Sequence, residues 1–135
     1  MMTSRERVAA ALAHRQPDRV PLDLGSTAVS GIAASALYRL REALGLEARP
    51  VQVYEPYQML GRVDEDVLDA IGADWVGLSD TGTFFGFPQA DWKPFTLFDG
   101  TPVLVPGGFN TEPEPNGDLY QYPLGDRSLP PSGRM

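Results

Sequence analysis

The segment RVPLDLGST, residues 19–27, has the pattern of a short β-strand that ends in a turn. Its apolar residues Val20, Leu22 and Leu24 alternate with other residue types, so an extended chain would carry them on one face. Pro21 lacks a backbone N–H and therefore favours the edge or the first residue of a strand. A second apolar run, WVGL at residues 75–78, predicts another buried strand.

Helical patterns surround these two predicted strands. Residues 3–16 begin with Thr3 and Glu6 at the spacing of a capping box, in which each residue satisfies a free backbone N–H of the other. Residues 30–45 and 64–72 carry apolar side chains at helical spacing and end at a glycine. The order helix, strand, helix, helix, strand indicates an α/β fold with a parallel sheet.

The last quarter of the chain has a different composition. Seven of the 13 prolines and five of the 14 glycines lie in the last 35 residues, which disfavours regular helix there. We therefore expect two parts: a helix and strand part at residues 1–82, and a β-hairpin or meander insertion with an irregular tail at residues 83–135.

Within the second part, residues 92–123 predict a β-meander. Asp99 and Gly100 lie between two strand-like runs, and this pair is typical of a hairpin turn in which both residues have positive φ. Residues 125–135 show no regular pattern, so we predict neither a helix nor a strand in them.

Charge and composition exclude several classes of partner. The chain has 11 basic and 18 acidic residues, a net charge of −7, and no cysteine. A negative surface repels phosphate backbones, so we expect no nucleic-acid partner. No apolar run approaches the roughly 20 residues needed to span a bilayer, and the amino terminus lacks the apolar core of a signal peptide. We expect a cytoplasmic protein with no membrane partner.

Three polar residues follow the first predicted strand. Asp23, Ser26 and Thr27 lie at its carboxyl end, which is where parallel α/β folds bind ligands. One interpretation is that their hydroxyls and backbone N–H groups bind a substrate anion. The other is an ordinary turn between strand and helix, held by a capping side chain.

Further candidates lie at two other turns. Tyr54 and Gln58 flank a proline turn and are candidates to line a substrate pocket, although aromatic residues at such turns more often serve packing. Asp80 follows the second predicted strand, where a carboxylate acts as an acid, a base or a substrate anchor, or starts a loop. In the acidic run at residues 64–69, Asp64 is interpreted as a helix cap and the other carboxylates as a solvated first turn.

Several stretches together resemble the uroporphyrinogen decarboxylase family. They are TSRERV with HRQPDRVP at residues 3–8 and 14–21, VYEP with VDEDVL at residues 53–56 and 63–68, and GDLYQYP with GDRS at residues 117–123 and 125–128. The resemblance covers nearly the whole chain. It is greatest to the branch that contains corrinoid-dependent methyltransferase-like proteins.

The resemblance implies a partial (β/α)8 TIM barrel, with its site at the carboxyl ends of the strands. Barrels of this type have roughly 250 residues. The chain would supply the amino-terminal helix, about two βα units and an inserted β-meander, and would be inactive alone. For the full-length parent the resemblance implies zinc or a corrinoid, with metal ligands beyond residue 135. For this chain it implies no cofactor and no metal site.

One difference between this sequence and the family bears on the choice between two reactions, decarboxylation and methyl transfer. Members that decarboxylate uroporphyrinogen, in porphyrin biosynthesis, carry an Arg-Gln-Ala-Gly-Arg-Tyr-like segment after the first strand, which binds substrate carboxylates. Here residues 24–30 read LGSTAVS, with no arginine. This favours a methyltransferase-like relative over a decarboxylating lyase, and Asp80 is only a positional candidate for the catalytic aspartate.

Two alternatives to the enzyme hypothesis stay open. In the first, the chain is a stand-alone, non-catalytic binding or interaction module. In the second, it is a truncated reading frame without independent activity. Because a lone pair of parallel strands leaves apolar faces exposed, the enzyme hypothesis predicts a homodimer or other self-association of the isolated chain, and a small-molecule substrate for the parent.

Overall fold

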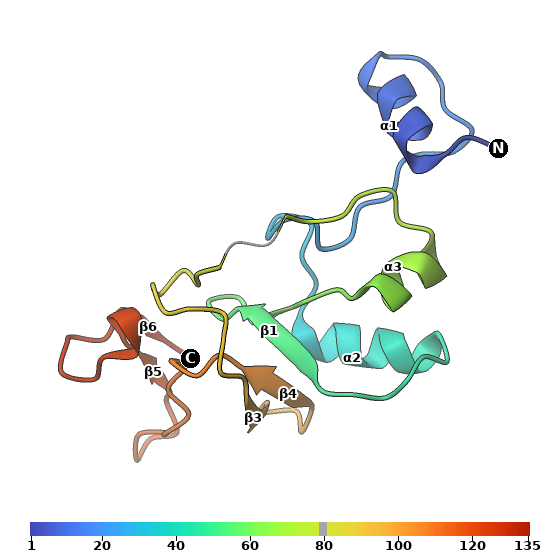
Figure 1. Cartoon of the computed structure of the whole chain (residues 1–135). Coiled ribbons are helices and arrows are strands. Elements are labelled where there is room, and N and C mark those ends of the chain that lie inside the picture. Colours follow the sequence, from blue (N-terminus) through green and yellow to red (C-terminus); the bar gives the residue numbers. More distant parts are fainter. Residues whose placement is uncertain (79–80) are drawn as a thin grey trace.

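The computed structural model describes residues 1–78 and 81–135 as a mixed α/β protein. The described elements, in chain order, are α1 (Ser4–Leu12), α2 (Ala34–Ala43), β1 (Val51–Glu55), β2 (Leu60–Gly61), α3 (Glu65–Ile71), β3 (Lys93–Thr96), β4 (Pro102–Val105), β5 (Tyr120–Gln121), the 3-10 helix η1 (Pro123–Gly125) and β6 (Gly133–Arg134). Figure 1 shows α1 at one end of the molecule, the sheet with α2 and α3 in the middle, and β5 with β6 at the other end.

The central sheet is mixed and has the order β2-β1-β4-β3. Strands β1 and β4 are parallel, with Val51 opposite Val103, whereas the two outer pairs are antiparallel. The buried valines of β1 and β4 form the core together with Ala34 and Leu37 of α2, because alternate residues of a strand face the same side. The sheet is therefore mixed and not parallel as expected, and its parallel pair is β1 with β4.

The two segments predicted as strands at residues 20–24 and 75–78 are extended but form no strand, so these two predictions are wrong. They nevertheless run side by side in the same direction. The Asp74 N–H donates to the Leu22 carbonyl at 2.8 Å, and Gly77 lies so close to Ser26 that a Cβ at residue 77 would be 2.7 Å from the Ser26 carbonyl oxygen.

No ladder develops between these segments, for a local reason. The Leu22 N–H donates to the side-chain carboxylate of Asp74 at 3.0 Å instead of to a strand carbonyl, and Pro21 has no N–H to donate. The apolar side chains are therefore uncovered: Val20, Val76 and Leu78 are 82%, 76% and 99% exposed.

The three helices begin and end close to the predicted residues. Thr3 and Glu6 form the predicted capping box, with the Glu6 N–H donating to the Thr3 hydroxyl at 3.3 Å. α2 and α3 are followed by Gly45 and Gly72, both with positive φ. Asp64 occupies the N-cap position of α3, but its side chain makes no cap hydrogen bond and pairs with Arg49 instead. The prediction of a capping role for that side chain is wrong.

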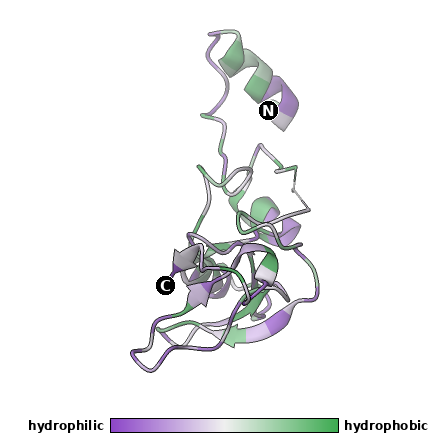
Figure 2. Cartoon of the chain, turned by 90° about the vertical axis from the view of Figure 1, so that its left-hand side faces the viewer, coloured by the Kyte–Doolittle hydropathy of each residue, from purple (hydrophilic) through white to green (hydrophobic). Residues whose placement is uncertain are grey.

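α1 stands away from the central sheet (Figure 1), although it carries hydrophobic residues (Figure 2). Ala10 is buried, whereas Leu12 is 72% exposed, so the helix buries only part of its apolar surface. Among the residues that the structure describes, none of the helices has the length and apolar character needed to cross a bilayer.

The predicted hairpin is confirmed, with a different turn. β3 and β4 pair around a three-residue loop in which the Gly100 N–H donates to the Leu97 carbonyl and the Leu97 N–H donates to the Thr101 carbonyl. Only Gly100 has positive φ, +83°, and Asp99 does not. A type I turn followed by a left-handed glycine is the usual three-residue solution, and it needs only one such residue.

The predicted meander at residues 92–123 does not continue beyond this hairpin. β5 pairs with β6, which lies in the carboxyl-terminal residues predicted to be irregular. The buried Gln121 side chain accepts from the Asn110 N–H and donates to the Asn110 carbonyl, at 3.0 and 3.1 Å, and so holds β5 beside the segment after β4.

Candidate functional site

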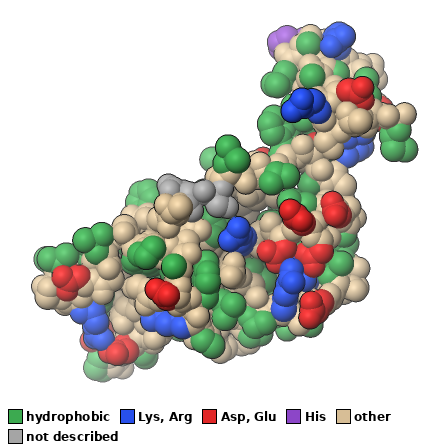
Figure 3. Space-filling view, viewed as in Figure 1, with side chains coloured by type: hydrophobic (Ala, Val, Ile, Leu, Met, Phe, Trp, Pro, Cys, Tyr) green, Lys and Arg blue, Asp and Glu red, His purple; other side chains and the backbone are tan. Residues whose placement is uncertain are grey.

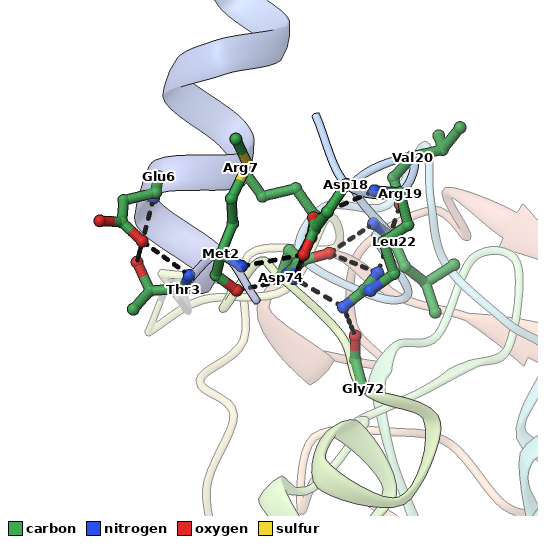
Figure 4. A network of polar contacts seen from close by, with 10 residues as sticks. All are labelled: Met2, Thr3, Glu6, Arg7, Asp18, Arg19, Val20, Leu22, Gly72 and Asp74. Atoms are coloured by element: carbon green, nitrogen blue, oxygen red, sulfur yellow. Dashed lines mark hydrogen bonds and ion pairs between the residues drawn. The ribbon is translucent and has the colours of Figure 1, made fainter. Parts of the chain in front are cut away.

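An ion-pair network holds the two parallel extended segments to α1 (Figure 4). Arg7 of α1 pairs with Asp18 at 2.7 Å and also with Asp74, whose side chain is fully buried. Arg19 pairs with Asp74 at 2.8 Å and donates to the Gly72 carbonyl at 2.7 Å. Residues far apart in the sequence are thereby fixed at the base of the two segments.

The charge of Asp74 is stabilised by these neighbours. Burial alone raises the pKa of this carboxyl, but hydrogen bonds from the Leu22 N–H, Ser4 and Arg7, and the charge of Arg19, outweigh burial and lower its pKa to about 2. The Arg7 guanidinium likewise holds the pKa of Asp18 well below its usual range. These groups stay charged at neutral pH and act as a structural joint.

A cavity of about 460 Å³ lies at the other end of the two segments. It is lined by residues 24–28, by Tyr54 and Glu55, by residues 62–65 and Leu68, by residues 76–78, and by residues 82–84 and Gln89. The carboxyl ends of three extended pieces of chain therefore meet here: the segment after Leu22, strand β1, and the segment after Asp74.

The turn after the first segment contributes hydroxyls to the cavity wall. Asp23 accepts hydrogen bonds from the Ser26 hydroxyl at 2.6 Å and from the Ser26 N–H at 3.2 Å. Burial raises the pKa of Asp23, but the hydrogen bonds from Ser26 and Ser30 outweigh it and leave the pKa below its ordinary value. Asp23 thus stabilises the turn, as one of the two interpretations predicted, while Ser26 and Thr27 line the cavity.

Tyr54 lines the same cavity, and its hydroxyl is buried. This hydroxyl group has no hydrogen-bond partner among residues 1–78 and 81–135. Burial, and secondarily the charge of Glu55, raise the pKa of Tyr54, so the phenol keeps its proton and can donate it in a hydrogen bond. A buried polar group without a partner is rare in folded proteins, and it costs stability.

Gln58 is not brought to the cavity, although Tyr54 is. Both oxygens of Glu55 accept from the backbone, one from the Tyr57 N–H at 2.9 Å and the other from the Gln58 N–H at 2.8 Å. The exposed Gln58 side chain lies outside the cavity lining. Asp80, the candidate catalytic carboxylate, lies outside the residues that the structure describes.

Arg62 lines the cavity and was missed by the sequence reasoning. In the described part of the chain, no ion pair or side-chain hydrogen bond engages its guanidinium. Its backbone N–H donates to the Gln52 carbonyl at 2.7 Å, which places it directly after β2. The only signal in the sequence is a lone arginine between an apolar run and an acidic run, and this pattern is too common to identify a site.

In the acidic run that follows Arg62, Glu65 and Asp69 are exposed as predicted, whereas Asp66 is paired with an arginine, contrary to the prediction. Asp66 accepts hydrogen bonds at 2.8 and 3.0 Å from Arg41, whose side chain is 2% exposed, and Arg49 pairs with Asp64 at 2.8 Å. Figure 3 shows acidic and basic side chains side by side over the region of α2 and α3. The carboxylate of Asp64, which lines the cavity, is thus largely neutralised by neighbouring arginines.

No group of three or more His, Asp or Glu side chains within the described ranges is arranged to hold a metal ion. The described residues that line the cavity offer hydroxyls, one guanidinium, three carboxylates and apolar side chains.

Comparisons with known proteins identify no relative from which the role of this cavity could be inferred. Searches of protein-family models, of curated proteins and of solved structures gave no match to the chain.

Proposed function

We propose that this chain is the amino-terminal part of a (β/α)8-barrel enzyme similar to the uroporphyrinogen decarboxylase family, and that the cavity is part of its substrate site. The observation that carries the proposal is the meeting of three carboxyl ends of extended chain at one cavity. Enzymes with this fold place their binding and catalytic residues at the carboxyl ends of the strands, on the loops that follow them.

The parallel segments support the same proposal. In a closed barrel every strand has a neighbour on both sides. Here the described segments at residues 20–24 and 74–78 share a single backbone hydrogen bond, from the Asp74 N–H to the Leu22 carbonyl, and they expose apolar side chains. Additional strands would cover these side chains and complete the ladder. The network around Asp74 holds the beginnings of the two segments next to each other.

Of the two reactions that the family resemblance implies, methyl transfer is the better supported. A polycarboxylated porphyrinogen needs several cationic partners, but residues 24–30 contain no arginine and Arg62 is the single guanidinium among the described lining residues. The chain's own residues would bind and orient a substrate. Any zinc or corrinoid would be bound by other parts of the parent protein.

Self-association of the isolated chain tests the barrel proposal. Sedimentation velocity of residues 1–135 at rising concentration should show a growing average mass, because exposed apolar edges associate. The double variant Val76→Ser/Leu78→Ser should weaken this association several-fold. The control Phe98→Ser removes an equally exposed apolar side chain, 103% exposed, from the β3–β4 loop and should leave association unchanged.

The opposite result favours the alternative of a stand-alone binding module. A monomer at all concentrations, with one cooperative thermal transition, would show that the exposed segments need no further strands. The barrel proposal would then be abandoned.

A further inference from the structure

We infer that the amino-terminal arm, residues 1–19, docks on the carboxyl-terminal end of α2 in a second copy of this chain, and that Arg15 of the arm pairs with Glu42 of the second copy. The inference does not depend on the proposed function. It follows from the opposite charges of the two parts, from a hollow on the arm, and from an exposed leucine between two carboxylates at the end of α2.

The arm and the rest of the chain have opposite net charges. Residues 1–19 contain four arginines and two carboxylates, a net charge of +2, whereas the whole chain has a net charge of −7. Residues 20–135 therefore carry a net charge of −9. Opposite charges attract and like charges repel, so contact between the arm of one copy and the body of another is favoured over contact between two bodies.

The arm has a surface without a partner. α1 has nine residues and stands away from the sheet (Figures 1 and 2), and isolated helices of this length are marginal in water. A hollow of about 610 Å³ lies on the arm. The described residues that line it all lie between Met1 and Asp18, and they include the apolar side chains of Met1, Met2 and Ala9. The hollow is therefore formed by the arm alone.

Arg15 is the charged group of the hollow that is free to bind a partner. Glu6 accepts the Thr3 N–H at 2.9 Å, and Asp18 pairs with Arg7 at 2.7 Å. The exposed Arg15 side chain has no ion pair or hydrogen bond in the described part of the chain. The hollow thus combines apolar side chains with one unpaired guanidinium.

The carboxyl-terminal end of α2 has the complementary features. Leu44, the C-cap residue, is 36% exposed, and the exposed residues Glu42 and Glu47 flank it in the sequence. The Glu42 carboxylate has no partner within the described ranges, and Glu47 has only a 3.9 Å contact with Arg49. An apolar side chain and two poorly paired carboxylates therefore lie together at this end of the helix.

Glu42 lies at a position that its own helix disfavours. The carboxyl-terminal end of a helix has partial negative charge, so a carboxylate in the last turn is unfavourable there. Arg41, the basic residue of this turn, is buried and pairs with Asp66. A guanidinium from a second copy would stabilise both the Glu42 carboxylate and the helix end. At the same time Leu44 would cover the apolar side chains of the hollow.

Sedimentation velocity of residues 1–135 at two salt concentrations tests the contact. The measurements use the Val76→Ser/Leu78→Ser background, which removes the association expected at the exposed segments. We expect this chain to associate at low salt and to associate about tenfold more weakly at high salt, because salt screens charges. Apolar contacts are not weakened in this way. A monomer at low salt, or equal association at both concentrations, would overturn the inference.

Two charge reversals in the same background assign the contact to its residues. Arg15→Glu and Glu42→Arg should each weaken association about tenfold, because each brings like charges together. An equimolar mixture of the two variants should restore association, since each copy then offers the charge that the other needs, and restoration shows that both variants are folded. The control Arg134→Glu makes the same change in net charge as Arg15→Glu, but in β6, and should associate like the background. Unweakened association of either reversal, or a mixture that stays monomeric, would overturn the pairing of Arg15 with Glu42.

This result is separable from the test of the barrel proposal. If the charge reversals have no effect while the double variant at residues 76 and 78 reduces self-association, only the contact of the arm is wrong. If the double variant has no effect while the reversals weaken association and their mixture restores it, only the barrel proposal is contradicted.

Discussion

At the scale of single residues, the chain combines well-satisfied charges with one unsatisfied hydroxyl. Asp74, Asp66 and Asp18 each accept hydrogen bonds from arginines, and the pKa of each is lowered. Tyr54 differs, because its buried hydroxyl has no partner in the described chain. A buried donor left unpaired costs stability, typically about 1–3 kcal/mol.

Removing the Tyr54 hydroxyl should therefore stabilise the ligand-free chain. We expect Tyr54→Phe to raise the free energy of unfolding by about 1 kcal/mol, because the phenyl ring keeps the packing and removes the desolvated polar group. Urea unfolding measures the change, with Tyr57→Phe at an exposed tyrosine as the control. A loss of stability on Tyr54→Phe would mean that the hydroxyl has a partner in solution.

The network around Asp74 predicts a dependence of stability on pH. The folded-state pKa of about 2 lies below the ordinary value of 3.8, so the ion pairs of Asp74 stabilise the fold above about pH 4. This contribution is lost as the pH falls from about 4 to about 2. Urea unfolding across this range should show stability falling with acidity, and Asp74→Asn should flatten the slope. An unchanged slope in Asp74→Asn would exclude this carboxyl as a cause.

At the scale of elements, local sequence signals placed the helices and the hairpin well. The capping box of α1, the glycines after α2 and α3, and the Asp99-Gly100 turn depend on residues within a few positions of each other. Their hydrogen bonds close locally, so the sequence predicts them. The turn type was wrong because the number of loop residues depends on how β3 pairs with β4.

The β3–β4 loop tests the importance of one backbone conformation. Gly100 has φ of +83° and open space around it, so Gly100→Ala meets no steric contact but must adopt a left-handed conformation. We expect a loss of about 1 kcal/mol in the free energy of unfolding. The control Gly82→Ala has equally open space without positive φ, and should be near neutral. Equal effects of the two changes would contradict the proposed turn geometry.

The cap of α1 gives a second test at this scale. Thr3→Ala removes the acceptor for the Glu6 N–H, at a cost of typically about 1 kcal/mol. Because α1 stands away from the sheet, the loss should appear as faster amide hydrogen exchange in α1, with little change in β1 and β4. Uniformly faster exchange would show instead that α1 unfolds only together with the sheet.

At the scale of the whole molecule, the arrangement of the parts differs from the predicted one. The parallel pair of the sheet is β1 with β4, whose partners Val51 and Val103 are 52 positions apart, and not the two apolar segments at residues 20–24 and 75–78. Those segments are instead held in parallel by ion pairs at one end and by the close contact of Gly77 with Ser26 at the other.

The sequence by itself determined the mixed α/β class, the three helices, the hairpin, and Ser26, Thr27 and Tyr54 as candidate site residues. These depend on local spacing, capping and turn chemistry. Only the tertiary structure decided which strands pair, that β5 joins β6, and that Arg62 lines the cavity. Such contacts join residues distant in sequence, and their choice depends on which backbone and charged groups find partners elsewhere in the fold.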